Sequence, residues 1–154
     1  MSHAEVKNIA HSVNVRLKNL AVQKQISFDY ILLRYALERF LFRLSVSRHA
    51  NRFILKGASA FAVWMGPVFR VTRDADLYCS GNSDSEFLLQ CFREICLQEV
   101  IPDGVTFDIA SMQASEIKIS LNEIFLFSIS LDKGFSPFFL GLTAPEKFSG
   151  AVRN

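Results

Sequence analysis

The segment Arg70-Val71-Thr72-Arg73-Asp74-Ala75-Asp76-Leu77-Tyr78-Cys79 decides the fold class and carries the main candidate site. Polar and apolar residues alternate from Asp74 onward, which is typical of a half-buried strand. The alternation predicts a strand over residues 74–79 in which Asp74, Asp76 and Tyr78 share one face. The intervening residues should face the core.

The two carboxylates of this strand suggest a cation site. Residues two apart on a strand project from the same face, so the Cβ atoms of Asp74 and Asp76 should lie roughly 6–7 Å apart. Two carboxylates held in this way can bind Mg²⁺, which prefers oxygen ligands and shares its sites with substrate phosphates. Taken alone, however, Asp-x-Asp favours a solvated strand edge, because the pattern occurs often by chance.

The preceding segment, Leu55-Lys56-Gly57-Ala58-Ser59, strengthens the cation hypothesis. The pattern predicts a strand over 52–56, a glycine turn and a short helix over 58–65. A glycine that opens a helix lets phosphate oxygens approach backbone N–H groups at the positive end of the helix dipole. Lys56, Gly57 and Ser59 are therefore candidate phosphate ligands. The alternatives are an ordinary strand-to-helix turn at Gly57 and a buried hydroxyl at Ser59.

Basic and hydroxyl side chains directly before the carboxylates extend this candidate site. Arg70 and Arg73 could each bind phosphate oxygens through a two-pronged guanidinium. A salt bridge from either arginine to Asp74 or Asp76 is an equally good interpretation. Thr72 could hydrogen-bond a phosphate or simply cap the strand.

The rest of the chain predicts a mixture of helices and strands. Apolar spacing predicts one or two short helices over 4–25 and a helix over 28–45, in which Arg34 and Glu38 form an i,i+4 pair. A capping box of Ser83 and Glu86 predicts a helix over 84–99. A turn at 102–104 precedes predicted strands over 105–110, 117–121 and 124–131.

Composition restricts the class of protein. The 154 residues, half of them apolar, suit a single domain with its own core, and a net charge of +2 neither demands nor excludes a nucleic-acid partner. No uncharged run reaches the roughly 18 residues of a membrane span, and the polar N-terminus argues against secretion, so we expect a cytoplasmic protein. The three cysteines should be buried and unpaired. We expect Arg39, Arg43, Arg48, His49 and Arg52 to face solvent.

Three segments in this order resemble the AbiEii/AbiGii toxin family of nucleotidyltransferase-like proteins: Arg34–Leu44, Phe53–Ala58 and Thr72–Leu77. The resemblance implies a polymerase-β-like nucleotidyltransferase domain of the α/β (α+β) class, with a mixed sheet and N-terminal helices. It also implies Mg²⁺-dependent transfer from a nucleoside triphosphate, within a toxin–antitoxin or abortive-infection system. Some members of the family add nucleotides to tRNA 3′ ends, so tRNA and a cognate antitoxin are the partners that the resemblance implies.

The family has a third acidic residue on a later strand. Asp132 is the best match here, because it follows an apolar run and precedes Lys133-Gly134-Phe135. It would bind the catalytic metal and help to deprotonate the attacking hydroxyl. A strand-end residue before a turn is the alternative interpretation, and Asp108 is the other candidate.

The chain ends at Asn154, whereas full-length relatives carry a helical C-terminal half. We therefore expect one domain, helical over 1–50 and sheet-containing over 51–140, that lacks that half. An inactive remnant that only binds an antitoxin or RNA is the competing hypothesis.

Overall fold

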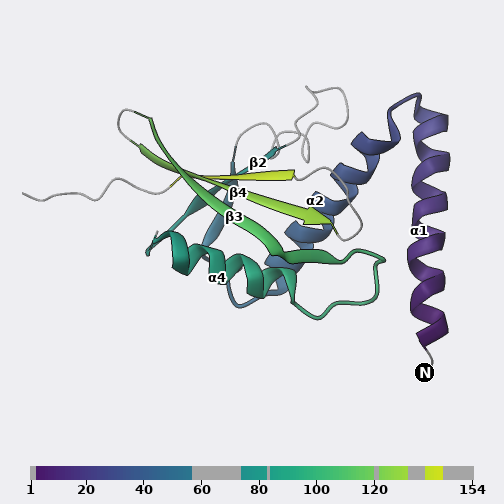
Figure 1. Ribbon diagram of the computed structural model, residues 1–154, viewed down its shortest axis with the longest axis horizontal. Coiled ribbons are helices and arrows are strands. Elements are labelled where there is room, and N and C mark those ends of the chain that lie inside the picture. Colours follow the sequence, from purple (N-terminus) through teal and green to yellow (C-terminus); the bar gives the residue numbers. More distant parts are fainter. Residues whose placement is uncertain (1–2, 57–73, 83, 120–121, 132–137, 144–154) are drawn as a thin grey trace, which may run out of the picture.

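A computed structural model describes residues 3–56, 74–82, 84–119, 122–131 and 138–143. The elements are α1 (His3–Lys24), α2 (Phe28–Val46), β1 (Phe53–Lys56), β2 (Asp74–Cys79), α4 (Ser85–Cys96), β3 (Phe107–Ile119), β4 (Asn122–Leu131) and β5 (Phe138–Thr143). In the described part of the chain, helices α1 and α2 are followed by a sheet and by helix α4, which confirms the predicted α+β class (Figure 1).

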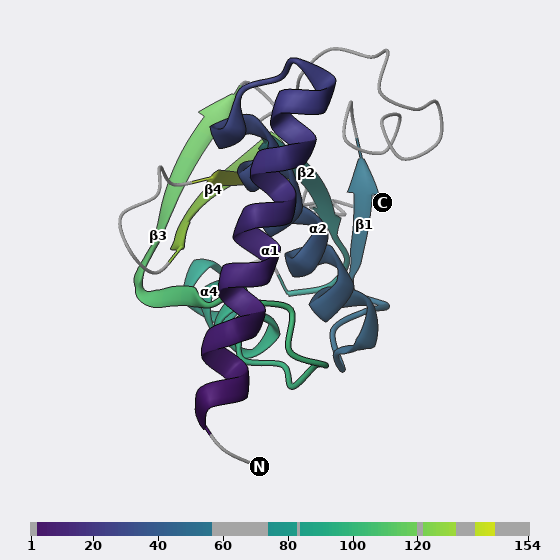
Figure 2. The same ribbon diagram turned by 90° about the vertical axis from the view of Figure 1, so that its right-hand side faces the viewer.

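The described strands form one sheet in the order β1-β2-β5-β4-β3. β2 and β5 run parallel, and the other neighbouring pairs are antiparallel, so the sheet is mixed as predicted. Helices α2 and α4 lie on the same side of the sheet, and α1 packs against α2 (Figures 1 and 2). The face turned away from α2 and α4 is called the outer face below.

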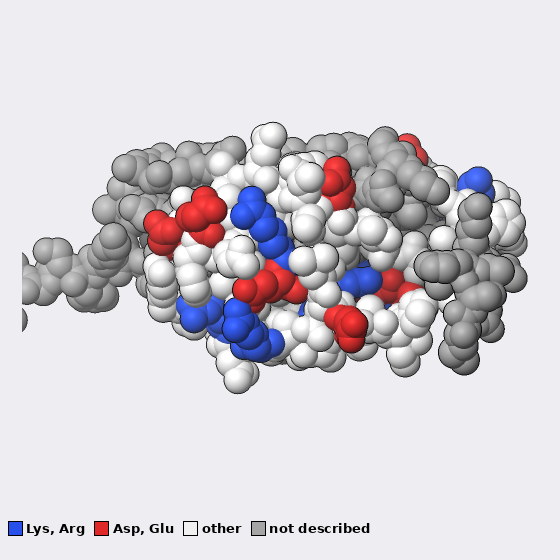
Figure 3. Space-filling view, turned by 60° about the horizontal axis from the view of Figure 1, so that its bottom comes forward, with Lys and Arg blue, Asp and Glu red and all other residues white. Residues whose placement is uncertain are grey.

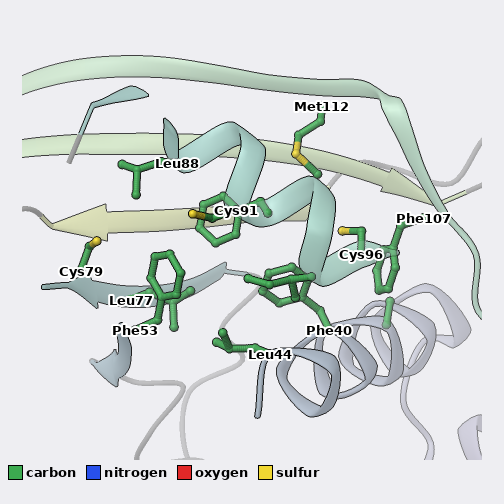
Figure 4. Packing of buried hydrophobic residues seen from close by; sticks show 13 residues of the cluster. Phe40, Leu44, Phe53, Leu77, Cys79, Leu88, Cys91, Cys96, Phe107 and Met112 are labelled. Atoms are coloured by element: carbon green, nitrogen blue, oxygen red, sulfur yellow. The ribbon is translucent and has the colours of Figure 1, made fainter. Parts of the chain in front are cut away.

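The core lies between these two helices and the sheet, and aromatic rings from three elements meet in it (Figure 4). The ring of Phe92 stacks on that of Phe53 at a centroid distance of 5.3 Å and lies 5.8 Å from that of Phe40. Phe40 and Phe92 are completely buried. Such rings contribute the largest apolar areas in a core, so this contact joins α2, α4 and β1 firmly.

Helix α4 shows why the local sequence folds as it does. Its buried residues recur at spacings of three and four, which gives one apolar face toward the core: Leu88, Cys91, Phe92, Ile95 and Cys96. The predicted cap at Ser83 is wrong, because Asp84 is the N-cap and its carboxylate accepts hydrogen bonds from the N–H groups of Glu86 and Phe87. The carboxylate accepts hydrogen bonds from two backbone N–H groups that have no partner within the helix. Its negative charge also complements the positive end of the helix dipole. The helix ends at Cys96, three residues before the predicted end.

The C-terminal strands differ from the prediction. The predicted strands at 105–110 and 117–121 are parts of one strand, β3, whose register against β4 shifts between Asp108 and Gln113. Pairing with β4 keeps the polar stretch between them extended, although its sequence does not alternate. β5 was not predicted. It lies in an uncharged segment without alternation, and it forms because β2 and β4 pair with it on both sides.

Candidate functional site

Asp76 lies on the outer face because its neighbours on β2 face the core. Leu77 and Cys79 are 1% and 0% exposed, so Asp76 takes the opposite face, where it is exposed. Asp74 is the first residue of β2, two positions earlier, and this even spacing is the one that places residues on a common face. The predicted strand is confirmed, and binding of a cation by its carboxylates stays a prediction.

Asp76 has a lysine on one side and a glycine on the other. The register pairs it with Lys56 of β1 and with Gly141 of β5. Lys56 is exposed and its Nζ lies 5.6 Å from the ring centroid of Tyr78. The described ion pairs include none between Lys56 and Asp76. Gly141 has no side chain, so β5 presents only backbone at the register position beside Asp76.

Most of the other predicted site residues lie outside the described residues: Gly57, Ser59, Arg70, Thr72, Arg73 and Asp132, together with the predicted helix over 58–65. β1 ends at Lys56 and β2 begins at Asp74. Since Lys56 pairs with Asp76, these two strand ends lie side by side. The alternating pattern placed Tyr78 on the same face as Asp76, as predicted. Sequence reasoning missed the neighbour Gly141, because nothing in the sequence indicated β5.

Asp108, the second candidate for the third acidic residue, is poorly placed. Its strand, β3, is separated from β2 by β5 and β4, which amounts to about 14 Å at the usual strand spacing. Its Oδ1 accepts hydrogen bonds from the backbone N–H groups of Ala110 and Ser111, at 3.1 and 3.3 Å. Within the described residues, no three His, Cys, Asp or Glu side chains gather as a metal site would. Asp132 stays the predicted third acidic residue.

The prediction that Arg43 faces solvent is wrong. Its side chain is 6% exposed, and it donates hydrogen bonds from Nη1 and Nη2 to the two carboxylate oxygens of Asp103, at 2.8 and 3.1 Å. Arg39 Nε also lies 3.1 Å from Asp103 Oδ2, an attractive distance, although its N–H is not aligned for a hydrogen bond. These ion pairs join α2 to the turn before β3, so the cluster has a structural role.

The prediction that His49 faces solvent is also wrong. His49 is 8% exposed, and its Nε2 lies 2.7 Å from Oε2 of Glu94 on α4. Hydrogen bonds from His49, Arg48 and Gln90 lower the pKa of Glu94 to about 2. Basic and acidic side chains are interspersed over the side of the molecule that α4 helps to form (Figure 3). Among the described residues, this side therefore has no patch of a single charge sign that would attract a charged substrate. The carboxylates of β2 remain the best candidate site.

The sequence of the chain matches the model of one known protein family. No described helix is both long and apolar enough to cross a membrane. No individual curated protein matches the chain. The model of one family, described as nucleotidyl transferase AbiEii toxin of a type IV toxin–antitoxin system, matches residues 39–137 and so includes β2 and its carboxylates. Because the match spans more than half of the sequence, the chain belongs to the AbiEii family of nucleotidyl transferase toxins.

Proposed function

We propose that this chain is a cytoplasmic Mg²⁺-dependent nucleotidyltransferase, which transfers a nucleotide from a nucleoside triphosphate to an acceptor such as tRNA and is counteracted by a cognate antitoxin. The observation that carries the proposal is the position of Asp76, exposed on the outer face, two residues after Asp74 and opposite Lys56. Membership of a toxin family supports it. The helical and sheet-containing parts act as one domain.

The donor set suits a divalent cation. Asp74 and Asp76 supply hard carboxylate oxygens from one extended strand. In this proposal both residues hold Mg²⁺, and Asp132 completes the acidic set. When bound, Mg²⁺ neutralises triphosphate charge and lowers the pKa of the attacking hydroxyl.

The triphosphate is held by the segment that joins β1 to β2. Gly57 and Ser59 offer backbone and hydroxyl hydrogen-bond donors within three residues of Lys56. Arg70, Thr72 and Arg73 precede Asp74 directly and meet the phosphate oxygens from the other end of the segment. Covalent connection to paired strands keeps both ends near Asp76. Phosphate ligands and metal ligands are thereby neighbours.

The proposed reaction is an in-line displacement at the α-phosphorus. The oxygen of the acceptor hydroxyl forms a bond to this phosphorus, and the bond from phosphorus to the α–β bridging oxygen breaks. Pyrophosphate leaves with the electron pair, and the hydroxyl proton passes to a carboxylate of the site. The protein's part is to position the two reactants and to balance charge.

Transfer of labelled nucleotide to tRNA tests the proposal. Asp76→Asn should lower the rate at least about a hundredfold, because a lost metal ligand removes several kcal/mol of transition-state stabilisation. Asp29→Asn is the matched control, since Asp29 is an exposed carboxylate in the first turn of α2. Equal rates for the two variants would contradict the assignment.

Calorimetry separates metal binding from turnover. The wild-type chain should bind a nucleoside triphosphate in the presence of Mg²⁺ and much more weakly in EDTA, and a variant with Asn at both Asp74 and Asp76 should bind weakly in either buffer. A wild-type chain that binds neither Mg²⁺ nor nucleotide would instead indicate an inactive binding module.

A further inference from the structure

Lys56 and Asp76 are neighbours of opposite charge that do not pair. They are direct register partners on the antiparallel strands β1 and β2, and the Cβ atoms of such partners usually lie about 4.5–5.5 Å apart. Oppositely charged side chains in this arrangement attract each other. Among the ion pairs of the described residues, however, none joins the Lys56 ammonium to the Asp76 carboxylate. Another contact must therefore hold the lysine.

The ring of Tyr78 provides that contact. Tyr78 follows Asp76 by two residues on β2, so it shares the outer face and is the diagonal neighbour of Lys56 across the two strands. Lys56 Nζ lies 5.6 Å from the centroid of this ring, within the range of a cation–π contact. Tyr78 is half-buried, whereas Lys56 is exposed. The better-packed ring therefore holds a flexible ammonium at one place beside the carboxylate.

The position of Lys56 decides what Asp76 can bind. An ammonium paired with the carboxylate would occupy its oxygen atoms and would also repel a divalent cation, which needs those oxygens as ligands. Over the ring, the ammonium is attracted by the negative π-face instead. This contact uses one side of the ammonium, so N–H groups of Lys56 remain for a phosphate oxygen. Both charges thereby stay available on the same face of the sheet.

We propose that Tyr78 is a positioning residue: its ring holds Lys56 away from Asp76, which leaves the carboxylate to a divalent cation and the ammonium to the phosphates of a nucleotide. The benefit for cation binding rests on the proposed function, whereas the position of Lys56 does not. Tyr78 itself contacts neither the cation nor the nucleotide. Because only the ring is needed, phenylalanine should replace Tyr78 and an aliphatic residue should not.

Binding of Mn²⁺ alone, followed by loss of the electron paramagnetic resonance signal of the free ion, tests the effect on Asp76. Mn²⁺ suits the same oxygen ligands as Mg²⁺. Tyr78→Leu should weaken binding about threefold, the usual strength of the cross-strand charge pair that then forms. Tyr78→Phe should bind Mn²⁺ as the wild-type chain does. Phe28→Leu is the matched control, because Lys18 Nζ lies 5.5 Å from the Phe28 ring centroid, on α1 and α2.

A double-mutant cycle isolates the lysine. In a Lys56→Met background, Tyr78→Leu should leave the affinity for Mn²⁺ unchanged, because no ammonium is then present to pair with Asp76. A ring that only stabilised the strand would instead matter equally in both backgrounds, and this result would overturn the proposal. Equal affinities of the wild-type chain and Tyr78→Leu would overturn it as well.

Nuclear magnetic resonance locates the lysine without any metal. In the wild-type chain and in Tyr78→Phe, the ring current should shift the ε-methylene protons of Lys56 upfield, and in Tyr78→Leu this shift should disappear. A wild-type chain without the shift overturns the proposal. A wild-type chain that shows the shift but binds no Mn²⁺ rejects the metal site of the proposed function and leaves the position of Lys56 in place.

Discussion

Replacing Arg43 with methionine should lower the free energy of unfolding by about 3 kcal/mol. The substitution removes two charge-assisted hydrogen bonds and leaves the Asp103 carboxylate, 8% exposed, without its main partner. Breaking a buried pair in this way typically costs about 3–5 kcal/mol. The lower end applies here, because Arg39 Nε stays 3.1 Å from Oδ2 and the Val105 N–H still donates to Oδ1 at 3.0 Å.

Urea denaturation of the full chain measures this cost. With a typical slope of about 2 kcal/mol per molar urea, the midpoint should fall by about 1.5 M at unchanged slope. Arg34→Met is the matched control, since Arg34 forms an i,i+4 pair with Glu38 whose side chains are 37% and 59% exposed. That pair should contribute at most about 0.5 kcal/mol.

A double-mutant cycle with Asp103→Asn isolates the pair. The two single substitutions should each be costly, and the double variant should be more stable than their sum predicts, because neither charge is then left alone in the interior. The reasoning is refuted if Arg43→Met costs no more than Arg34→Met, or if the two effects simply add.

Three further predictions use the same chain. The pKa of Glu94, about 2, lies below its ordinary value of 4.5, so its contribution is complete above about pH 4.5 and disappears as the pH falls toward 2. Over that window the wild-type urea midpoint should fall by the equivalent of about 1–2 kcal/mol, allowing for partial exposure, and Glu94→Gln should show a smaller fall. Gly104 has φ +74° and an added Cβ would lie 3.0 Å from the backbone of Ala10, so Gly104→Ala should cost about 3 kcal/mol. Gly81→Ala should cost only about 1 kcal/mol, because its nearest neighbour is the flexible end of Arg52, and equal costs would contradict this account. All three cysteines are buried and burial raises their pKa, so a thiol reagent should label them only after unfolding.

Local patterns were enough to predict the elements that carry the candidate carboxylates. Helix α2 follows from apolar spacing and from Ser27, whose hydroxyl accepts a hydrogen bond from the Tyr30 N–H. β2 follows from strict alternation, and the same alternation assigned Asp76 to the face opposite Leu77. In both elements the signal lies within a few residues of the feature that it predicts.

The surroundings of the site could not be predicted, because they depend on contacts between distant segments. Gly141 lies beside Asp76 only because β5 inserts between β2 and β4, and nothing in the sequence of β5 specifies that position. Arg43 is buried because Asp103, sixty residues later, pairs with it. A charged residue on a helix is usually exposed, so its sequence neighbours predicted the opposite.

One face of β2 packs in the core and contributes to stability, whereas the other face carries the candidate site. Substitutions on the two faces therefore test different properties of the protein. Leu77 and Cys79 belong to the core cluster with α2 and α4, and their truncation would leave a cavity and unfold the protein. Asp76, by contrast, is exposed on the outer face. Substitution of Asp76 should therefore change binding or transfer while the core stays intact. A loss of function at Asp76 with an unchanged urea midpoint consequently reports on the site itself, and not on the fold that holds it.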